Sequence, residues 1–244
     1  MSLTAVMIHG FAGSSRSWDA VATEISDRSE LALARIDLPG HGEAVDIDPA
    51  GYAQAAEMAL SAAPGELVLC GYSLGARVAL AAALARPARV AGLVMLSGHA
   101  GIDDAEARAR RRSADERLAA RIEAMDAEQF ADLWNGQAVF EADSPEVHRQ
   151  ARAELVEAVP ARLAAALRSL GPGAFEPAWG LLADLRMPML AVAGEDDGDY
   201  PLHAQRLARL ARGRSVILPG GHRQHLENPG RLAAELEALC SEAG

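Results

Sequence analysis

The chain has 244 residues, 50% of them hydrophobic and 23% charged, which is enough for one sizeable buried core. Its formal net charge of −11 argues against nucleic acid as a partner, although a few local arginines can still hold a small anionic molecule. The two cysteines, Cys70 and Cys240, make neither a disulfide framework nor a zinc site, and we predict no metal and no cofactor.

The chain begins without the basic stretch of a secretory signal, and its apolar runs are all too short to cross a membrane. We therefore expect a cytoplasmic protein with no membrane span. Six short apolar runs, each closed by turn residues, predict buried parallel strands, and most are separated by stretches of helical composition. This alternation predicts an α/β protein with a doubly wound, mostly parallel sheet of about six strands. The runs are 4–10, 31–40, 66–73, 90–98, 187–195 and 214–221.

The loop after the first run reads HGFAGSS. Its His9-Gly10 pair permits a close approach of the backbone, and we expect His9 itself to be structural. The backbone N–H of Phe11 is a candidate donor for a substrate oxygen that becomes negatively charged during a reaction.

The third run ends in Gly71-Tyr72-Ser73-Leu74-Gly75, a G-x-S-x-G sequence that opens a helix. At such a strand-to-helix turn the serine takes a strained backbone conformation, and glycines flank it because side chains would collide with the neighbouring strand and helix. The hydroxyl is then exposed at a helix N-terminus. Ser73 is therefore the candidate nucleophile, and the backbone N–H of Leu74 is the second candidate oxyanion donor.

Arg77 follows four residues after Ser73, so both side chains lie on one face of the predicted helix. A guanidinium beside the serine suits a substrate carboxylate, which it binds through two parallel hydrogen bonds. The alternative is an ion pair between Arg77 and an acidic residue of the lid or of a loop.

Residues 99–175 contain no strand-like run and are rich in Ala, Arg and Glu. A helical lid fits this length better than a structureless loop. We therefore expect a core of residues 1–98 and 176–244 with the lid inserted into it. Phe130, Trp134 and Phe140 either hold the lid together or form the wall of a pocket.

A serine needs a base, and the last two runs are followed by GEDDGDY and PGGHRQHLENP. His222 follows a strand end and two glycines, so we predict that it is the base. His225 is the competitor, which we expect to be a packing or surface residue. The acid that orients the imidazole lies in the first of these loops, and Asp196 and Asp197 both fit.

Five stretches resemble the α/β-hydrolase superfamily along essentially the whole chain. They are HGFAGSSRSW, DLPGHG, GYSLGARVAL, GEDD and GGHRQHLENP. The resemblance implies the α/β-hydrolase fold, with catalytic residues in the chain order Ser, acid, His.

Within the superfamily the chain is similar to the 2-succinyl-6-hydroxy-2,4-cyclohexadiene-1-carboxylate synthases of menaquinone biosynthesis. The likeness lies in GYSLGARVAL, SGHAGIDDAEARARRRSADERLA, FADLWNGQAVF, LRSLGPGAFEPAW and GHRQHLENP. It implies a lyase that eliminates pyruvate from a multiply anionic cyclohexene intermediate by breaking a carbon–oxygen bond, with the triad acting as a base.

The same resemblance implies that Asp197 is the acid and that Arg111 contacts a substrate carboxylate. Arg110 and Arg112 are expected to be solvated arginines paired with Glu. We also expect Tyr72 and Trp134 to contact the substrate.

The chain departs from this family on the later lid helix, where members carry a further Arg. A gapless match places Leu155 there, and Arg149 or Arg152 is the candidate replacement. Two other functions stay open. A serine hydrolase of esters, thioesters or carbon–carbon bonds that bear a carboxylate needs the triad and Arg77 alone. A ligand-binding homologue without catalysis needs only the fold.

Overall fold

The computed structural model describes residues 3–243, so residues 1, 2 and 244 of the expected core lie outside the described part. Six strands form one sheet in the order β2-β1-β3-β4-β5-β6, and every pair of neighbours is parallel. The predicted parallel sheet of about six strands is confirmed. The strands are β1 (Leu3–Ile8), β2 (Ala32–Ile36), β3 (Glu66–Tyr72), β4 (Val90–Leu96), β5 (Met189–Gly194) and β6 (Arg214–Leu218).

Burial differs between the central and the edge strands. In β5 all residues are buried, and in β3 only Glu66 is not, because helices cover both faces of the middle of the sheet. The prediction that all six strands are buried is wrong for β2 and β6. Both are edge strands with one neighbour each, and most of their side chains keep contact with solvent.

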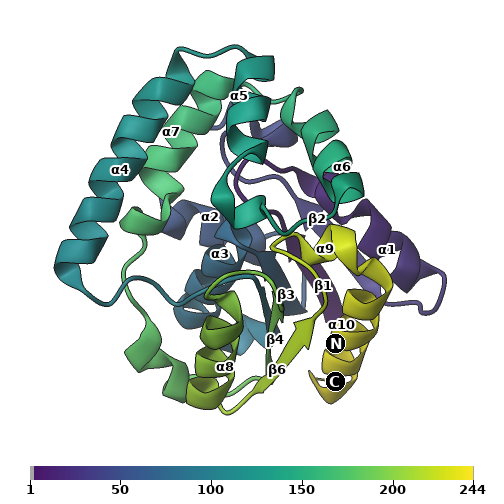
Figure 1. Ribbon diagram of the computed structural model, residues 1–244. Coiled ribbons are helices and arrows are strands. Elements are labelled where there is room, and N and C mark those ends of the chain that lie inside the picture. The colour runs from purple at the N-terminus through teal and green to yellow at the C-terminus, as the bar shows by residue number, and fades with distance from the viewer. Residues whose placement is uncertain (1–2, 244) are drawn as a thin grey trace.

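Helices cover both faces of the sheet (Figure 1). On one face α1 and α10 pack together over apolar side chains of β1, β3 and β4. On the other face α2, α3 and α8 bury the larger of the two cores. The helices are α1 (Asp19–Ser26), α2 (Tyr52–Leu60), α3 (Leu74–Ala85), α4 (Ala105–Glu123), α5 (Ala127–Asn135), α6 (Pro145–Leu155), α7 (Pro160–Leu170), α8 (Tyr200–Ala211), α9 (Gln224–Glu227) and α10 (Pro229–Ala243).

The helical insertion predicted between the fourth and fifth strands consists of α4 to α7, which gather at the top of Figure 1. Helix α4 packs along α7, and α5 packs along α6. Apolar side chains from all four helices, among them Ile122, Phe130, Leu155 and Leu167, form most of a third core, which also includes Ala12 from the loop after β1. The insertion is therefore a packed layer and not a structureless crossover.

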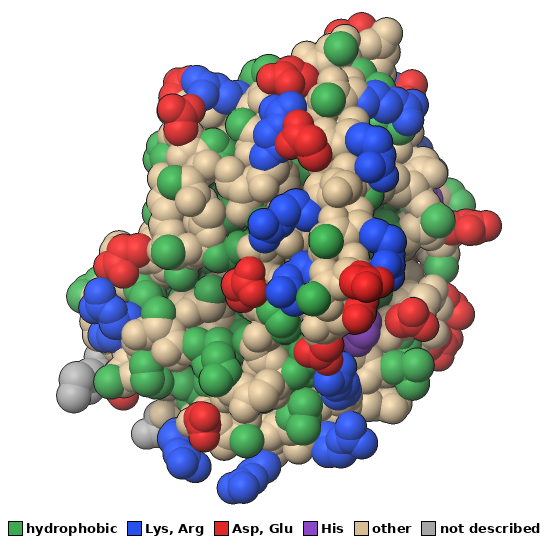
Figure 2. Space-filling model, turned by 90° about the vertical axis from the view of Figure 1, so that its left-hand side faces the viewer, with side chains coloured by type: hydrophobic (Ala, Val, Ile, Leu, Met, Phe, Trp, Pro, Cys, Tyr) green, Lys and Arg blue, Asp and Glu red, His purple; other side chains and the backbone are tan. Residues whose placement is uncertain are grey.

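The outer face of the molecule on the α4 side carries arginine and acidic side chains interspersed with each other (Figure 2). Among residues 3–243 no helix is long and apolar enough to span a membrane.

Candidate active site

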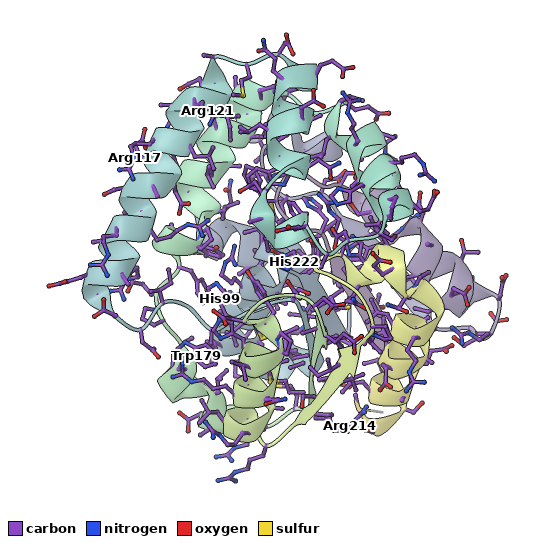
Figure 3. All side chains as sticks on the ribbon, viewed as in Figure 1. His99, Arg117, Arg121, Trp179, Arg214 and His222 are labelled. Carbon is purple, nitrogen blue, oxygen red and sulfur yellow. The ribbon has the colours of Figure 1, made fainter. Side chains whose placement is uncertain are left out.

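The candidate catalytic residues all follow the carboxyl ends of strands. Ser73 follows β3, His222 lies after β6, Asp197 lies after β5 and Phe11 lies after β1. Because the carboxyl ends of parallel strands meet at one edge of a sheet, four segments that are distant in the sequence come together there. Figure 3 shows His222 at this meeting point, below the helical insertion.

The turn from β3 into α3 has the strained geometry that the sequence predicts. Ser73 has φ 52° and ψ −104°, in a region that residues with a side chain rarely occupy. A Cβ at Gly71 would overlap the backbone of Gly75, and a Cβ at Gly75 would overlap the carbonyl of Ile8. Glycine at both positions therefore allows the tight turn that leaves the Ser73 hydroxyl partly exposed.

Ser73, His222 and Asp197 form a hydrogen-bonded chain. The Ser73 hydroxyl lies 3.3 Å from His222 Nε2, and His222 Nδ1 lies 2.7 Å from Asp197 Oδ1. His222 and Asp197 are each 2% exposed, whereas Asp196 is exposed to solvent. Nδ1–H donates to the carboxylate, so Nε2 is free to accept the hydroxyl proton. Of the two acids considered, Asp197 is the one beside the imidazole.

Aromatic rings surround the imidazole of His222. Tyr200, Tyr72 and Phe140 have ring centroids 4.7, 5.3 and 5.7 Å from it. His225 is 3% exposed and packs 4.3 Å from Tyr72, so it is a packing residue on the far side of that ring. It lies in α9, before the last helix begins.

Two backbone N–H groups are available as donors for an oxyanion site. Within residues 3–243, neither the N–H of Phe11 nor that of Leu74 has a hydrogen-bond acceptor. Leu74 is the first residue of α3, where a helix leaves its N–H groups unpaired. In the loop that holds Phe11, His9 Nδ1 lies 2.7 Å from the Gly10 carbonyl, and its Nε2 accepts the Leu38 N–H. Both ring nitrogens of His9 thus have backbone partners.

Arg77 is buried, with 3% of its surface exposed. Its Nε donates to the Tyr52 hydroxyl at 2.8 Å, and that hydroxyl donates to the carbonyl of Leu170 at the end of α7. No carboxylate of residues 3–243 forms an ion pair with Arg77, so the predicted alternative of a lid or loop partner is wrong. A buried guanidinium without a counter-ion is costly, and a bound anion would remove that cost.

Arg111 lies on α4 with its side chain partly exposed. Its Nε donates to Asp115 Oδ1 at 2.7 Å, and Asp115 Oδ2 accepts the N–H of Gly173 at 3.1 Å. Asp115 is buried, so this ion pair fixes the stem of Arg111. Arg110 pairs with Asp104 and Glu106 on the surface, as expected. Arg112 instead donates to the carbonyl of Gly173, which the expectation of a Glu partner missed.

The charges of Arg77 and Arg111 both influence the pKa values of three side chains, those of His99, Tyr52 and Tyr200. Burial, together with the charges of Arg77, His203 and Arg111, lowers the pKa of His99 to about 3. Burial raises the pKa of Tyr52 and of Tyr200, and both arginines oppose the rise. Both guanidinium groups therefore influence the charge states of His99, Tyr52 and Tyr200. The ring centroid of Tyr200 lies 6.4 Å from that of His99 and 4.7 Å from that of His222.

His99 itself is a neutral hydrogen-bond donor at this place. Its Nδ1 accepts the N–H of Gly101 at 3.0 Å, so the ring proton is on Nε2. Neither His99 nor Tyr52 was predicted. No local feature of the sequence singles out Tyr52. His99 directly follows the predicted strand 90–98, and this position could have identified it as a candidate.

The aromatic residues of the insertion divide into two groups. Phe130 is fully buried and only packs the insertion. The ring of Trp134 lies 4.5 Å from that of Phe11, and together with Tyr72 and Phe140 it lines a small cavity of about 40 Å³. Trp134 and Tyr72 are thus wall residues of a space next to the serine turn.

Neither Arg149 nor Arg152 takes the place of the arginine that family members carry on the later lid helix. Arg149 is exposed and pairs with Glu146, while Arg152 pairs with Glu128 and Asp132 on the surface. Neither side chain reaches the site, and Leu155 lies in the core of the insertion. The buried cation that does lie where the insertion meets the triad is Arg223, which was not predicted.

The larger cavity of about 400 Å³ lies elsewhere, between α6–α7 and the loops after β1 and β2. Its charged lining is mostly acidic, with Asp37, Glu43, Glu154 and Glu157 against Arg16. This lining disfavours an anionic molecule, and none of the triad residues borders the cavity. Among residues 3–243 no group of His, Cys, Asp or Glu is arranged to hold a metal ion.

Comparisons with known proteins agree with this fold. The model of the alpha/beta hydrolase family matches residues 5–235. The 2-succinyl-6-hydroxy-2,4-cyclohexadiene-1-carboxylate synthase of Enterobacter sp. (strain 638) is 33% identical, over 96% of this chain and 90% of that protein. The structure of MenH from S. aureus superposes with a TM-score of 0.86 at 25% identity, over 99% of this chain and 94% of that one. A malate-bound thermophilic esterase from Thermogutta terrifontis gives 0.79 at 27% identity, over 100% and 91%.

Proposed function

The chain belongs to the alpha/beta hydrolase family, and we propose that it is a lyase of menaquinone biosynthesis that eliminates pyruvate from a succinylated, multiply anionic cyclohexene intermediate. The proposal assigns the base to Ser73, His222 and Asp197, and the oxyanion donors to Phe11 and Leu74. The relatives that carry the synthase name match nearly the whole chain, so the comparison does not rest on one motif.

One observation carries the proposal: the buried guanidinium of Arg77, four residues after Ser73, has no carboxylate partner among residues 3–243. A site for an uncharged ester has no use for such a group, whereas a substrate carboxylate would satisfy its remaining N–H donors. Arg111 supplies a second cation in the same region, held by Asp115. Together they favour a substrate with more than one carboxylate.

The proposed reaction needs a base and a site for developing negative charge. His222 accepts the Ser73 proton, and the Ser73 oxygen removes a proton from a ring carbon of the substrate. The electron pair of that carbon–hydrogen bond forms a carbon–carbon double bond, and the carbon–oxygen bond to the departing pyruvate enolate breaks. The enolate then takes up the proton held by His222, which gives pyruvate and returns the imidazole to its neutral form. Asp197 holds the imidazole in the correct tautomer and stabilises its charged form. No acyl intermediate forms.

The identity and the ratio of the products test this proposal. The intermediate, made in place by the preceding enzymes of the pathway, is added to the purified protein. Pyruvate is followed by a coupled dehydrogenase assay, and the ring product by its diene absorbance. Elimination gives pyruvate and diene in equal amounts. No pyruvate above the background without protein contradicts the assignment.

A second candidate is a serine hydrolase of carboxylate-bearing esters, thioesters or carbon–carbon bonds. The observation that favours it is the likeness at 27% identity to an esterase whose structure holds malate, a dicarboxylate. Hydrolysis would use the same triad and Arg77 but would pass through an acyl-serine. Turnover of p-nitrophenyl esters at the rates of dedicated esterases, without diene formation, favours this candidate over the first.

We propose further that residues 99–175 act as a lid on a core of residues 1–98 and 176–244. Supporting this division, α4 to α7 form most of a third core and contribute Trp134, Phe140 and Arg111 to the site. The cavity beside Tyr72 has a volume of about 40 Å³, little more than one water occupies. This cavity is too small to hold a substrate the size of the intermediate, and neither Ser73 nor Arg77 lines it.

A further inference from the structure

His99 lies at the carboxyl edge of the sheet, in the segment that directly follows β4. Its ring centroid is 6.4 Å from that of Tyr200, and the Tyr200 centroid is 4.7 Å from that of His222. Ser97, two residues before His99, donates its hydroxyl to the carbonyl of His222 at 2.9 Å. His99 is therefore one aromatic ring away from the proposed base, on a segment bonded to the loop that carries this base.

Hydrogen bonds to the backbone fix the loop that carries His99. The N–H of Ala178 donates to the carbonyl of Ala100 at 2.7 Å, and the indole N–H of Trp179 donates to the carbonyl of Gly101 at 2.9 Å. Gly101 has φ +99°, a conformation that favours glycine. The imidazole is thus attached to a backbone that is already held in place without a ligand.

The protein uses one nitrogen of the His99 ring and leaves the other without a partner. Nδ1 accepts the Gly101 N–H at 3.0 Å, so Nε2 carries the ring proton. Within residues 3–243 this Nε2–H has no hydrogen-bond acceptor, and the Tyr200 hydroxyl has none either. Both side chains are partly exposed, so a ligand can reach them. Their ring centroids are 6.4 Å apart, which one carboxylate can bridge because each of its oxygens accepts at about 2.8 Å.

The charges that act most strongly on His99 are all positive. They are those of Arg77 on α3, Arg111 on α4 and, when protonated, His203 on α8. A hydrogen-bond donor in a positive potential favours an anion as its acceptor. Burial and these charges lower the pKa of His99 to about 3, so its ring is neutral at neutral pH. His99 therefore offers a donor to an anion without adding a further unpaired cation to the site.

We propose that the His99 Nε2–H and the Tyr200 hydroxyl together donate hydrogen bonds to a substrate carboxylate other than the one bound by Arg77. The proposed substrate carries three carboxylates, on the ring, on the succinyl group and on the departing pyruvate. Arg77 and Arg111 provide two cations, so the third carboxylate needs other donors. The inference deepens the proposed function and rests on it for the identity of this carboxylate.

The test measures the binding of two probes to the full chain by titration calorimetry, which is independent of turnover. The probes are propane-1,2,3-tricarboxylate and pentanedioate, which has the same five-carbon chain without the central carboxylate. The variants are His99→Phe, His99→Gln and Tyr200→Phe. Both His99 variants lose the acceptor for the Gly101 N–H, but Gln keeps an N–H donor near the position of Nε2. The two variants therefore differ in the proposed donor.

Wild type should bind the tricarboxylate roughly tenfold or more tightly than the dicarboxylate, because hydrogen bonds hold the additional charged group. His99→Phe and Tyr200→Phe should each lose roughly tenfold in affinity for the tricarboxylate and less than about threefold for the dicarboxylate. His99→Gln should stay within about threefold of wild type for both probes. His148→Phe is the control, since this partly exposed side chain on α6 has no hydrogen bond within residues 3–243, and both affinities should be unchanged.

Equal losses in His99→Phe and His99→Gln would overturn the inference, because a residue that only supports its loop does not depend on the Nε2 donor. Equal losses for both probes in His99→Phe would overturn it too, since they show a general loss of anion binding. If the His99 variants do not fold, Tyr200→Phe makes the same comparison, because its ring keeps the contact with His222.

Pyruvate release by the same proteins tests the proposed function separately. Wild type that shows the expected binding pattern but releases no pyruvate overturns the lyase and supports a carboxylate site at His99. Wild type that releases pyruvate, with unchanged tricarboxylate affinity in His99→Phe and Tyr200→Phe, overturns the His99 site alone.

Discussion

Ser73 and Arg77 are one helical turn apart at the start of α3, and each has a feature that is costly without a function. Ser73 has strained backbone angles, and Arg77 is a buried cation whose protein partner is the neutral Tyr52 hydroxyl. Strain and unpaired charge concentrate at functional sites because folding alone selects against them. These two features are the reason why we propose a base beside an anion site at the start of α3.

Replacing Ser73 by Ala should reduce pyruvate release by about 10⁴-fold or more, because the proposed base and its relay are lost together. Asp197→Asn should also lose several orders of magnitude, since an amide stabilises the wrong imidazole tautomer. Steady-state kinetics on variants with unchanged circular dichroism check both. Asp196→Asn is the control, because that exposed side chain has no contact with His222.

Arg77→Met should weaken binding of an anionic substrate by roughly 2–5 kcal/mol, because a buried carboxylate would lose its partner. Tyr52→Phe should have a smaller effect in the same direction, about 1 kcal/mol, since it removes only the acceptor of the Arg77 Nε–H. The measurement is KM, or inhibition by a tricarboxylate analogue. Equal affinity in all three proteins would show that Arg77 supports the fold and nothing else.

The sequence predicted those site residues whose signal is local. Ser73 stands in a strand–turn–helix pattern, and His222 follows a strand end and two glycines, so both were identified from the residues themselves. The choice of Asp197 over Asp196 needed a family resemblance, because adjacent carboxylates on a turn look alike. Asp143 and Tyr52 were missed, since each meets its arginine only across the fold and neither has a distinctive neighbourhood in the sequence.

At the scale of elements, the arginines of the helical insertion differ in where they point. We propose that one of them serves the site, whereas another points to the surface. Arg111 is directed by Asp115, four residues further along α4, and Asp115 is itself anchored by the backbone of Gly173. Arg152 on α6 points to surface carboxylates instead. The helical nature of the insertion was predictable from composition, whereas the direction of each arginine depends on how the four helices pack.

Arg111→Gln should therefore raise KM for the anionic intermediate by about tenfold and change kcat less, because a partly exposed charge contributes modestly to binding. Arg152→Gln should leave both constants within about twofold of wild type, as expected for an exposed ion pair. The pair of variants is measured under identical ionic strength. A larger KM effect for Arg152 than for Arg111 would contradict the placement of the second cation.

At the scale of the whole molecule, the chain has a net charge of −11, so the proposed anion site depends on a few local cations. The larger acidic cavity and the mixed charges of the surface leave Arg77 and Arg111 as the local source of positive potential. Such a site depends on short-range contacts, because long-range attraction is weak for a protein of this charge. A parallel sheet of about six strands was predictable from the apolar runs. The burial of the edge strands was not predictable, since it depends on which strands end the sheet.

Stability should fall as the pH drops below about 6.5. Burial lowers the pKa of His41, His99 and His225 to about 3 each, so these rings stay neutral in the folded chain while they take up protons in the unfolded one. Each imidazole then reduces the free energy of unfolding by about 1.4 kcal/mol per pH unit between its two pKa values. Burial raises the pKa of Asp143 and Glu154, which opposes this trend in part.

Urea denaturation at several pH values measures the effect. His225→Phe should reduce the slope of stability against pH by about one proton, because it removes a buried ring whose Nδ1 has no partner among residues 3–243. Stability that is constant or rises on acidification from neutral pH would contradict the neutral state of these histidines.

The initial rate of pyruvate release at neutral pH, measured for wild type and Ser73→Ala side by side, tests whether the Ser73 base eliminates pyruvate from an anionic cyclohexene. We expect one pyruvate for each diene formed by wild type, and a rate lower by about 10⁴-fold or more in the variant. Pyruvate release by wild type no faster than in buffer, or equally fast in both proteins, would contradict it.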